Sequence, residues 1–329
     1  GVFGTTVVAF FLAEMGDKTQ IATVALAARY TDLVAVVAGT TLGMMIANVP
    51  AVYLGEAITR VRYGGGGAFK LGIATERTQT VVQAARQVAA LAQSLKDIGL
   101  EPGDRVMLVS ENRPEWCIAD LGIMAAGCVT VPTYTTNTER DHQHIIEDSG
   151  ASAIIVSTPK LAQAVMPAAI RATRAHQLIG IEELRVGQST GVTIRNWKDM
   201  VGGPADVEAC AAHAAATFKR DDLACIIYTS GTGGAPRGVR QHHGAILCNV
   251  EGCAEVISED FGWEDEVFLS FLPLSHAYEH TGGQHFPVGL GAQIYYSEGL
   301  DKLASNIEET KPTIMVVVPR LFEVLRARI

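Results

Sequence analysis

The sequence has few charged and few aromatic residues. Of its 329 residues, 19% are charged and 6% aromatic, whereas 48% are hydrophobic, and the mean hydropathy is +0.20. Basic residues are outnumbered by acidic ones, 26 against 35, and they form no run. A nucleic-acid-binding protein that depends on a basic surface is therefore excluded. The composition also excludes a disordered tail and a collagen-like repeat.

Paired cysteines are also absent, since none of the six forms a Cys-x-x-Cys pair. Several lie in apolar segments, so we expect buried free thiols in a reducing compartment. The chain begins at Gly1, without Met or a basic leader, and we expect it to be a fragment rather than a natural start. The cysteines are Cys117, Cys128, Cys210, Cys225, Cys248 and Cys253.

The charges that are present divide the chain into two parts. Residues 1–62 contain four basic and four acidic residues, so the net charge of −9 comes wholly from residues 63–329. Residues 33–55 are 23 consecutive uncharged residues, enough to cross a bilayer core of about 30 Å. The preceding segment, residues 3–30, is also apolar except near its middle. We therefore predict two transmembrane α-helices in residues 1–62, in contact with membrane lipid through residues 3–55.

Three charged residues interrupt the first apolar segment. Glu14, Asp17 and Lys18 are spaced so that they share one helix face. Charges near a bilayer centre are costly and usually face a partner or a polar cavity. They therefore indicate an intramembrane cation or proton site. The alternatives are a loop between two short apolar stretches and a buried helix of a soluble domain.

The motif around these charges resembles a known transporter family. Residues 13–20, Ala-Glu-Met-Gly-Asp-Lys-Thr-Gln, and residues 38–43, Ala-Gly-Thr-Thr-Leu-Gly, resemble the second repeat of small membrane cation exchangers with a Glu-x-Gly-Asp-Lys-(Ser/Thr) motif. The resemblance implies that Glu14 and Asp17 bind a divalent metal, calcium or manganese, exchanged for protons. It also implies a partner chain that supplies the other repeat.

A glycine-rich segment follows the apolar part. Four glycines at residues 64–67 favour a flexible linker over residues 63–78. A phosphate-binding glycine loop is disfavoured because no strand precedes the glycines and no Lys-Ser or Lys-Thr follows them. Arg60 and Arg62 favour placing residues 63–329 in the cytoplasm under the positive-inside rule. We therefore predict a membrane-associated protein that is multi-pass at its N-terminus.

The remainder of the chain, residues 79–329, predicts an α/β domain. Apolar residues recur at helical spacing over residues 81–95. Short apolar runs bounded by Gly or Pro predict strands. The alternation of these runs with helical stretches indicates parallel-rich sheets covered by helices. The predicted strands are residues 105–109, 129–134, 153–157, 225–228, 267–271, 292–296 and 313–318.

One predicted strand continues into a loop suited to phosphate. Residues 225–238 read Cys-Ile-Ile-Tyr-Thr-Ser-Gly-Thr-Gly-Gly-Ala-Pro-Arg-Gly, and a helix is predicted to begin near His242. Glycines let backbone N–H groups approach phosphate oxygens, and hydroxyls and an arginine add further donors. The loop is not a Walker A loop, because Val-Arg follows Gly238. A purely structural turn would need neither the hydroxyls nor the arginine.

Residues 228–238 resemble the signature of AMP-forming acyl-CoA synthetases and their adenylating relatives, Thr-Ser-Gly-Thr-Thr-Gly-x-Pro-Lys-Gly. Gly233 replaces a usual Thr, and Arg237 a usual Lys, which exchanges a point charge for a planar fork. Residues 100–106, 112–116, 272–276 and 318–322 also match family segments, so the resemblance covers residues 79–329. The loop residues that it implies for binding ATP and pyrophosphate are Thr229, Ser230, Gly231, Thr232, Gly233, Gly234 and Arg237.

The resemblance implies a reaction, its cofactors and an acyl pocket. The family joins a fatty acid to AMP with ATP and magnesium and then transfers the acyl group to CoA, and His276 and Tyr278 are its implied acyl-pocket residues here. The catalytic lysine and the magnesium-binding glutamate of the family lie beyond Ile329, so we expect no complete turnover from this chain alone. Two other hypotheses stay open: a half-repeat of a cation/proton exchanger, and a fusion with neither activity.

Several histidines call for a separate interpretation. Residues 276–280 fit the His-x-x-Glu-His pattern of inverted zinc peptidases. We disfavour zinc there because Gly282 and Gly283 follow at once and leave little room for the helix that must present both histidines. Four further histidines are expected on the surface or in loops: His142, His144, His242 and His243.

Overall fold

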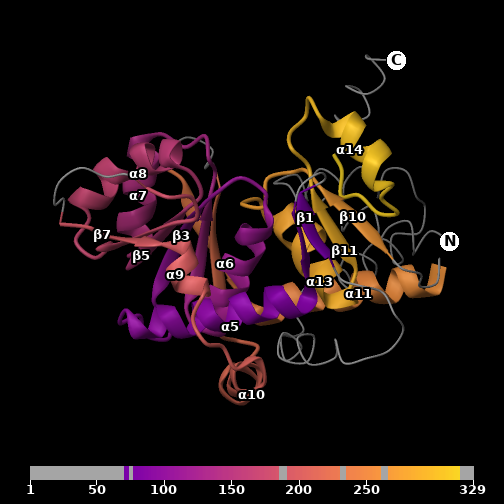
Figure 1. The fold of residues 1–329 in the computed structure, drawn as a ribbon, viewed down its shortest axis with the longest axis horizontal. Helices are drawn as coiled ribbons and strands as arrows, with labels where there is room; N and C mark the ends of the chain where they lie inside the picture. Colours follow the sequence, from indigo (N-terminus) through magenta and orange to yellow (C-terminus); the bar gives the residue numbers. More distant parts are fainter. Residues whose placement is uncertain (1–69, 74–76, 185–190, 230–234, 261–265, 319–329) are drawn as a thin grey trace, which may run out of the picture.

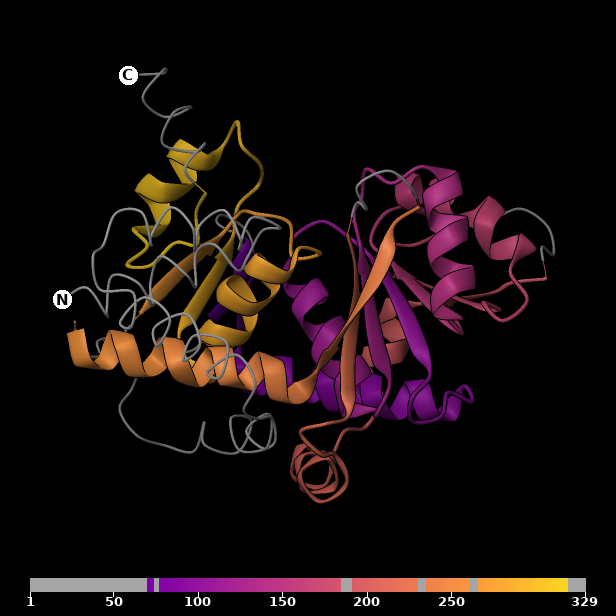
Figure 2. The same ribbon diagram turned by 180° about the vertical axis from the view of Figure 1, so that it is seen from behind.

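The computed structural model describes residues 70–73, 77–184, 191–229, 235–260 and 266–318. The predicted transmembrane helices, including Glu14 and Asp17, lie outside these residues. Within them, no helix is long and apolar enough to cross a membrane. The predicted α/β class is confirmed for the described part, which contains two sheets with helices packed on them (Figures 1 and 2).

The larger sheet has the strand order β7-β6-β5-β3-β4-β8-β9. Every neighbouring pair is parallel except β8 and β9, which form an antiparallel hairpin. Because the parallel strands end at one edge, the loops that follow them gather there. The strands are β3 (Arg105–Val109), β4 (Val129–Thr133), β5 (Ala153–Val156), β6 (Gln177–Gly180), β7 (Thr193–Asn196), β8 (Leu223–Thr229) and β9 (Arg237–His242).

The smaller sheet has the strand order β10-β11-β1-β2. Strand β11 is parallel to both β10 and β1, and β2 is antiparallel to β1. The strands are β1 (Lys70–Ile73), β2 (Arg77–Thr80), β10 (Val267–Ser270) and β11 (Gln293–Tyr296). In place of a predicted strand at residues 313–318, Ile314 forms an isolated bridge with Phe268.

Strands β1 and β2 correct part of the predicted linker over residues 63–78. Residues 70–73 and 77–78 pair in the smaller sheet, because β11 offers β1 a free edge with which it can form a ladder. The glycines at 64–67 lie outside the described residues. The division of the chain into a membrane segment, a linker and an AMP-binding domain stays a prediction.

Helices cover both faces of the larger sheet. On β3, Val106 and Leu108 pack into the cluster formed with α5 and α6, whereas Met107 and Val109 pack into the cluster formed with α7 and α8. This alternation follows from the two-residue period of a strand. The helices on this sheet are α5 (Val81–Asp97), α6 (Pro114–Ala125), α7 (Glu139–Ser149), α8 (Pro159–Arg171) and α9 (Trp197–Val201). Helix α10 (Val207–Thr217) packs instead against α5 and α6.

The remaining helical segments follow the hairpin β8–β9. Figure 2 shows the long helix α11 running alongside the smaller sheet. Segments α12, η1 and α13 follow one another without a break, and η1 is π-helical. Their bounds are α11 (His243–Asp260), α12 (Ala277–Glu279), η1 (His280–His285), α13 (Phe286–Leu290) and α14 (Leu303–Thr310).

Helix α6 lies between the two sheets (Figure 1). All of its residues are buried. Its core cluster includes Leu108 from the larger sheet together with Ile294 and Tyr296 from the smaller one. A helix that is buried all round has no solvent face, so α6 joins the two sheets through a shared core.

Candidate functional site

The signature loop connects the antiparallel strands β8 and β9. Thr229 ends β8 and Arg237 begins β9, and the two residues are register partners. Both are exposed. The predicted phosphate-binding residues Ser230, Gly231, Thr232, Gly233 and Gly234 lie outside the described residues. The structure therefore brings together the two described members of the predicted set.

The backbone of β9 passes close to β8 just after Arg237. A Cβ atom on Gly238 would lie 2.8 Å from Cγ2 of Ile226 and 3.0 Å from Cζ of Tyr228. Contacts this short would force the side chains of Ile226 and Tyr228, or the strands that carry them, to shift. The glycine therefore permits the register that sets Arg237 opposite Thr229.

Two residues of helix α7 form hydrogen bonds with the residues on either side of the loop. The hydroxyl of Tyr228 donates to Oδ2 of Asp148 at 2.6 Å. Nε2 of His144 lies 2.8 Å from the carbonyl oxygen of Pro236, and because a carbonyl only accepts, this nitrogen carries the proton. The rings of His144 and Tyr228 also pack edge to face. We call His144, Asp148 and Tyr228 the α7 clamp.

The charge state of the clamp suits its hydrogen bonds. Burial raises the pKa of Tyr228 above its ordinary value, and the hydrogen bond to Asp148 and the negative charge of that carboxylate raise it further. The phenol therefore stays neutral and remains a donor near neutral pH. A donor to a carboxylate forms a stronger bond than one to a neutral acceptor.

Helix α7 is in turn held at both of its ends. Thr138 and Asp141 form a capping box at its N-terminus. At its C-terminus, the guanidinium of Arg105 donates to the carbonyl oxygens of Ser149 and Gly150, at 2.6 and 2.8 Å. These bonds satisfy groups that a helix end leaves without intrahelical partners. His144 and Asp148 of the clamp therefore project from a helix with fixed ends.

The two predicted acyl-pocket residues lie at the start of α12. Nδ1 of His276 accepts from the backbone N–H of Tyr278 at 3.2 Å, which caps the helix, and His276 is exposed. The hydroxyl of Tyr278 donates to the carbonyl oxygen of Val317 at 3.4 Å. Within the described residues, neither side chain has a hydrogen bond or ion pair to Thr229 or Arg237. Their role in an acyl pocket stays a prediction.

Asn112 connects two segments that the sequence resemblance singled out. Its Nδ2 donates to the carbonyl oxygen of Leu272 at 2.6 Å, and its Oδ1 accepts from the N–H of Leu274 at 3.0 Å. One amide therefore pairs with both the acceptor and the donor of the segment before α12. This places the start of α6 against the smaller sheet.

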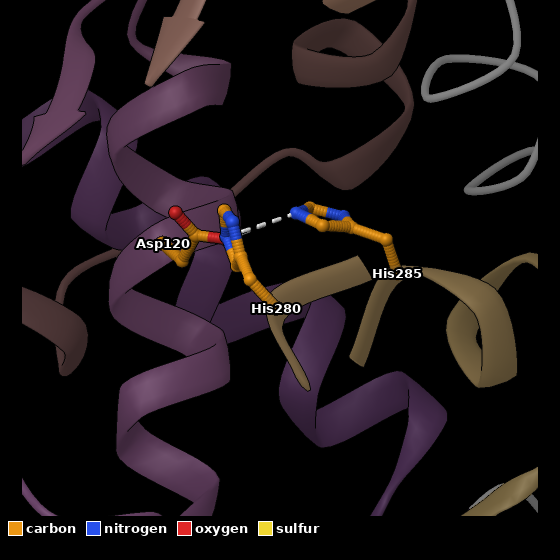
Figure 3. A group of neighbouring side chains, drawn as sticks. All are labelled: Asp120, His280 and His285. Atoms are coloured by element: carbon orange, nitrogen blue, oxygen red, sulfur yellow. Dashed lines mark hydrogen bonds and ion pairs between the residues drawn. The ribbon is translucent and has the colours of Figure 1, made fainter. Parts of the chain in front are cut away.

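A buried polar cluster lies where α6 meets η1 (Figure 3). Oδ2 of Asp120 lies 2.8 Å from Nε2 of His280, 2.7 Å from Nε2 of Gln284 and 3.3 Å from Nε2 of His285. Asp120, His280 and Gln284 have no exposed surface, and His285 is 3% exposed. Sequence reasoning missed this cluster. Its one signal was an acidic residue, Asp120, in the middle of an apolar run of α6.

Charge compensation within the cluster determines the state of Asp120. Burial alone would raise the pKa of this carboxyl, but the charge and hydrogen bond of His280, followed by those of His285, hold the pKa below its ordinary value. The neighbouring Glu279 lacks such partners. Burial raises the pKa of Glu279 to about 8, although its Oε1 accepts from the hydroxyl of Ser270 at 2.5 Å.

The structure corrects the expectation that Gly282 and Gly283 leave little room for a helix. Helical structure runs through both glycines, since they lie within η1. A glycine costs a helix only about 1 kcal/mol relative to alanine, and here each lies close to a packed neighbour, Val316 or Glu279. The disfavoured His276 and His280 pair still does not form, because His276 is exposed at the cap whereas His280 is buried.

The expectation that four histidines lie on the surface or in loops is wrong for three of them. His142 is fully buried in α7, His144 belongs to the α7 clamp, and His243 is buried at the start of α11. Burial lowers the pKa of His243 to about 4, and the ring stacks on Phe218. His242 is exposed, as expected, although it ends a strand.

Two long-chain acyl-CoA ligases are similar in sequence to this chain over most of its length. The long-chain-fatty-acid–CoA ligase FadD15 of Mycobacterium tuberculosis is 31% identical over 247 residues, which are 74% of this chain and 39% of the relative. The peroxisomal long chain acyl-CoA synthetase 7 of Arabidopsis thaliana is 31% identical over 275 residues, 82% of this chain and 37% of the relative. The chain thus spans about two fifths of the length of these relatives.

A solved structure has the same fold. The N-terminal domain of FACL13 from Mycobacterium tuberculosis superposes with a TM-score of 0.64 at 23% identity, over 84% of this chain and 65% of that chain. At this identity the likeness shows the fold alone. It agrees with the α/β architecture described above.

Two family models match different parts of the chain. Residues 2–69 match the model of the divalent cation/proton antiporter GDT1. Residues 59–328 match the model of the AMP-binding enzymes, and this range contains the signature hairpin, the α7 clamp and both sheets. Because the second match covers most of the chain, the protein belongs to the family of AMP-binding enzymes.

Proposed function

We propose that residues 59–328 form the ATP-binding part of a long-chain acyl-CoA synthetase. The complete reaction would join a fatty acid to AMP, release pyrophosphate, and then transfer the acyl group to the thiol of CoA. Long-chain acyl-CoA ligases among the relatives support this substrate class. The observation that carries the proposal is the signature hairpin, in which Arg237 stands opposite Thr229 at the carboxyl edge of the larger sheet.

Arg237 and Thr229 would act on the phosphates of ATP. The guanidinium of Arg237 presents several N–H donors in a plane and can donate two hydrogen bonds to one phosphate group. The hydroxyl of Thr229 offers a further donor beside it. Since both side chains are exposed at the mouth of the hairpin, they are accessible to a nucleotide. Positive charge there would favour the departure of pyrophosphate by stabilising its developing negative charge.

Magnesium does not fit the described residues of this loop. Magnesium prefers oxygen ligands, chiefly carboxylates and phosphates. The carboxylate beside the hairpin, that of Asp148, already accepts the hydroxyl of Tyr228. We therefore derive no step through magnesium from these residues, which suit the phosphate groups of ATP themselves.

The test compares two arginines on the same strand. Arg237→Ala should abolish or strongly reduce the rise in thermal midpoint that ATP or pyrophosphate causes. Arg240→Ala is the matched control, since Arg240 is also exposed on β9 and an odd number of residues away, hence on the opposite face. Isothermal titration of ATP gives the same comparison as a Kd. No ligand-induced shift in the unaltered chain, or equal loss in both variants, would contradict the proposal.

We propose a second function for the N-terminal part, because residues 2–69 match the antiporter model. Glu14 and Asp17 would bind a divalent cation within the membrane, where paired acidic residues mark ion pathways. The chain reconstituted in liposomes should take up manganese or calcium in exchange for protons from inside the liposomes. Asp17→Asn should abolish this uptake. Asp32→Asn is the control, because Asp32 is also an aspartate but lies outside the motif. Equal uptake by the chain and its Asp17→Asn variant would refute this function.

A further inference from the structure

The geometry of η1 brings two histidines to one side of the segment. His280 and His285 are five residues apart, which in an α-helix separates side chains by about 140° around the axis. A π-helix instead pairs residue i with residue i+5. In the structure the two rings are 4.6 Å apart between centroids, and both face Asp120 on α6 (Figure 3).

The three side chains present their ligand atoms as a small triangle. Nε2 of His280 lies 2.8 Å from Oδ2 of Asp120, Nε2 of His285 lies 3.3 Å from that oxygen, and the two Nε2 atoms are 3.1 Å apart. Ligands bound to zinc at about 2.0 to 2.1 Å in a tetrahedron are separated by about 3.3 Å. The triangle is therefore close in size to one face of a zinc coordination shell.

Hydrogen bonds alone do not account for the cluster. The two Nε2 atoms face each other and the same carboxylate oxygen, so if both carry a proton, the two protons compete for one region of space. Three further polar atoms of the cluster are buried without a partner: Oδ1 of Asp120, Oε1 of Gln284 and Nδ1 of His285. Buried polar atoms without partners are uncommon and often mark an ion or a water.

The carboxylate also lacks a permanent counter-charge among its bonded partners. Asp120 lies on a helix that is buried all round, and its hydrogen-bond partners are two imidazoles and an amide. Buried charges in proteins are generally paired with an opposite charge or coordinate a metal ion. A divalent cation would compensate it and would replace the competing protons on the two Nε2 atoms.

We propose that Asp120, His280 and His285 form a binding site for a zinc-like divalent transition-metal ion. Two imidazoles and one carboxylate are ligands that such ions favour. Metal-binding histidines usually donate their other ring nitrogen to a neighbour. Nδ1 of His280 lies 4.0 Å from Sγ of Cys225 on β8, the strand that leads into the signature loop. The site would tie α6 of the core to η1 by metal coordination.

The test begins with the full chain, without a histidine tag. After dialysis against zinc and then against metal-free buffer, elemental analysis should find one equivalent of zinc per chain. Addition of cobalt should give the visible absorption of a tetrahedral nitrogen and oxygen site. The thermal midpoint should rise with zinc concentration, since an ion that binds only the folded state stabilises it.

Variants then assign the ligands. His285→Gln should lose the bound zinc, the cobalt spectrum and the zinc-dependent rise in thermal midpoint, and Asp120→Asn is a second variant with the same expected losses. His242→Gln, at an exposed histidine, is the matched control and should retain all three. A metal-free chain after zinc dialysis, or equal zinc content in the control and in a folded His285→Gln variant, would overturn the proposal. ATP binding, measured separately, reports on the proposed function and not on this site.

Discussion

At the scale of single residues, Tyr228 couples the signature loop to the rest of the molecule. Its ring is buried, and its hydroxyl donates to Asp148 on α7. Tyr228→Phe removes this bond while keeping the ring, so we expect the free energy of unfolding to fall by about 1 kcal/mol. We also expect ATP to bind more weakly, because the flanks of the loop lose one of their two hydrogen bonds to α7.

Urea denaturation and ATP titration check this prediction. Tyr295→Phe is the control, because the hydroxyl of Tyr295 contacts Gln293 in the smaller sheet at 3.5 Å, away from the loop. It should leave ATP affinity unchanged. If Tyr228→Phe and Tyr295→Phe bind ATP equally well, the clamp does not position the loop.

Sequence reasoning predicted a phosphate-binding role for residues of the loop, but it did not predict the residues that hold the loop. Thr229 and Arg237 belong to a local motif whose chemistry is visible in eleven consecutive residues. Asp148 and His144 are separated from their partners by 80 and 92 residues. Their contacts arise from strand order in the larger sheet, which no local pattern specifies. The same holds for Asp120, which is 160 residues from His280.

At the scale of elements, α7 depends on its N-terminal cap. The hydroxyl of Thr138 accepts from the N–H of Asp141, and the Asp141 carboxylate accepts from the N–H of Thr138. Thr138→Ala removes the first bond and should lower the free energy of unfolding by about 1 kcal/mol. Chemical denaturation measures this loss. Thr136→Ala, at an exposed position two residues earlier, should cost much less, and equal losses would show that the cap contributes nothing.

Some elements were predictable because their pattern is local, and others were not. Strand β3 begins and ends where predicted, since an apolar run follows Arg105 and ends before a polar segment. Strand β9 was missed because its residues are mostly polar and exposed, and it exists through pairing with β8. Segment η1 was missed because its glycines read as helix breakers, whereas packing against Val316 and Glu279 accommodates them.

At the scale of the whole molecule, the α/β class followed from sequence, while the joining of two sheets did not. The alternation of strands and helices predicted parallel sheets, but nothing in it showed that β1 and β2, early in the chain, would pair beside β11 near its end. This pairing joins the strands at residues 70–73 and 77–80 to the smaller sheet.

Helix α6, with no exposed face, has a consequence for how the molecule unfolds. Its core cluster includes side chains from both sheets, so separating the sheets would expose apolar surface on the helix whichever sheet it followed. That cost couples the two sheets, because neither sheet keeps its full apolar core when the other unfolds. The described residues should therefore behave as one cooperative folding unit, with the amides of α6 exchanging with solvent only when that unit opens as a whole.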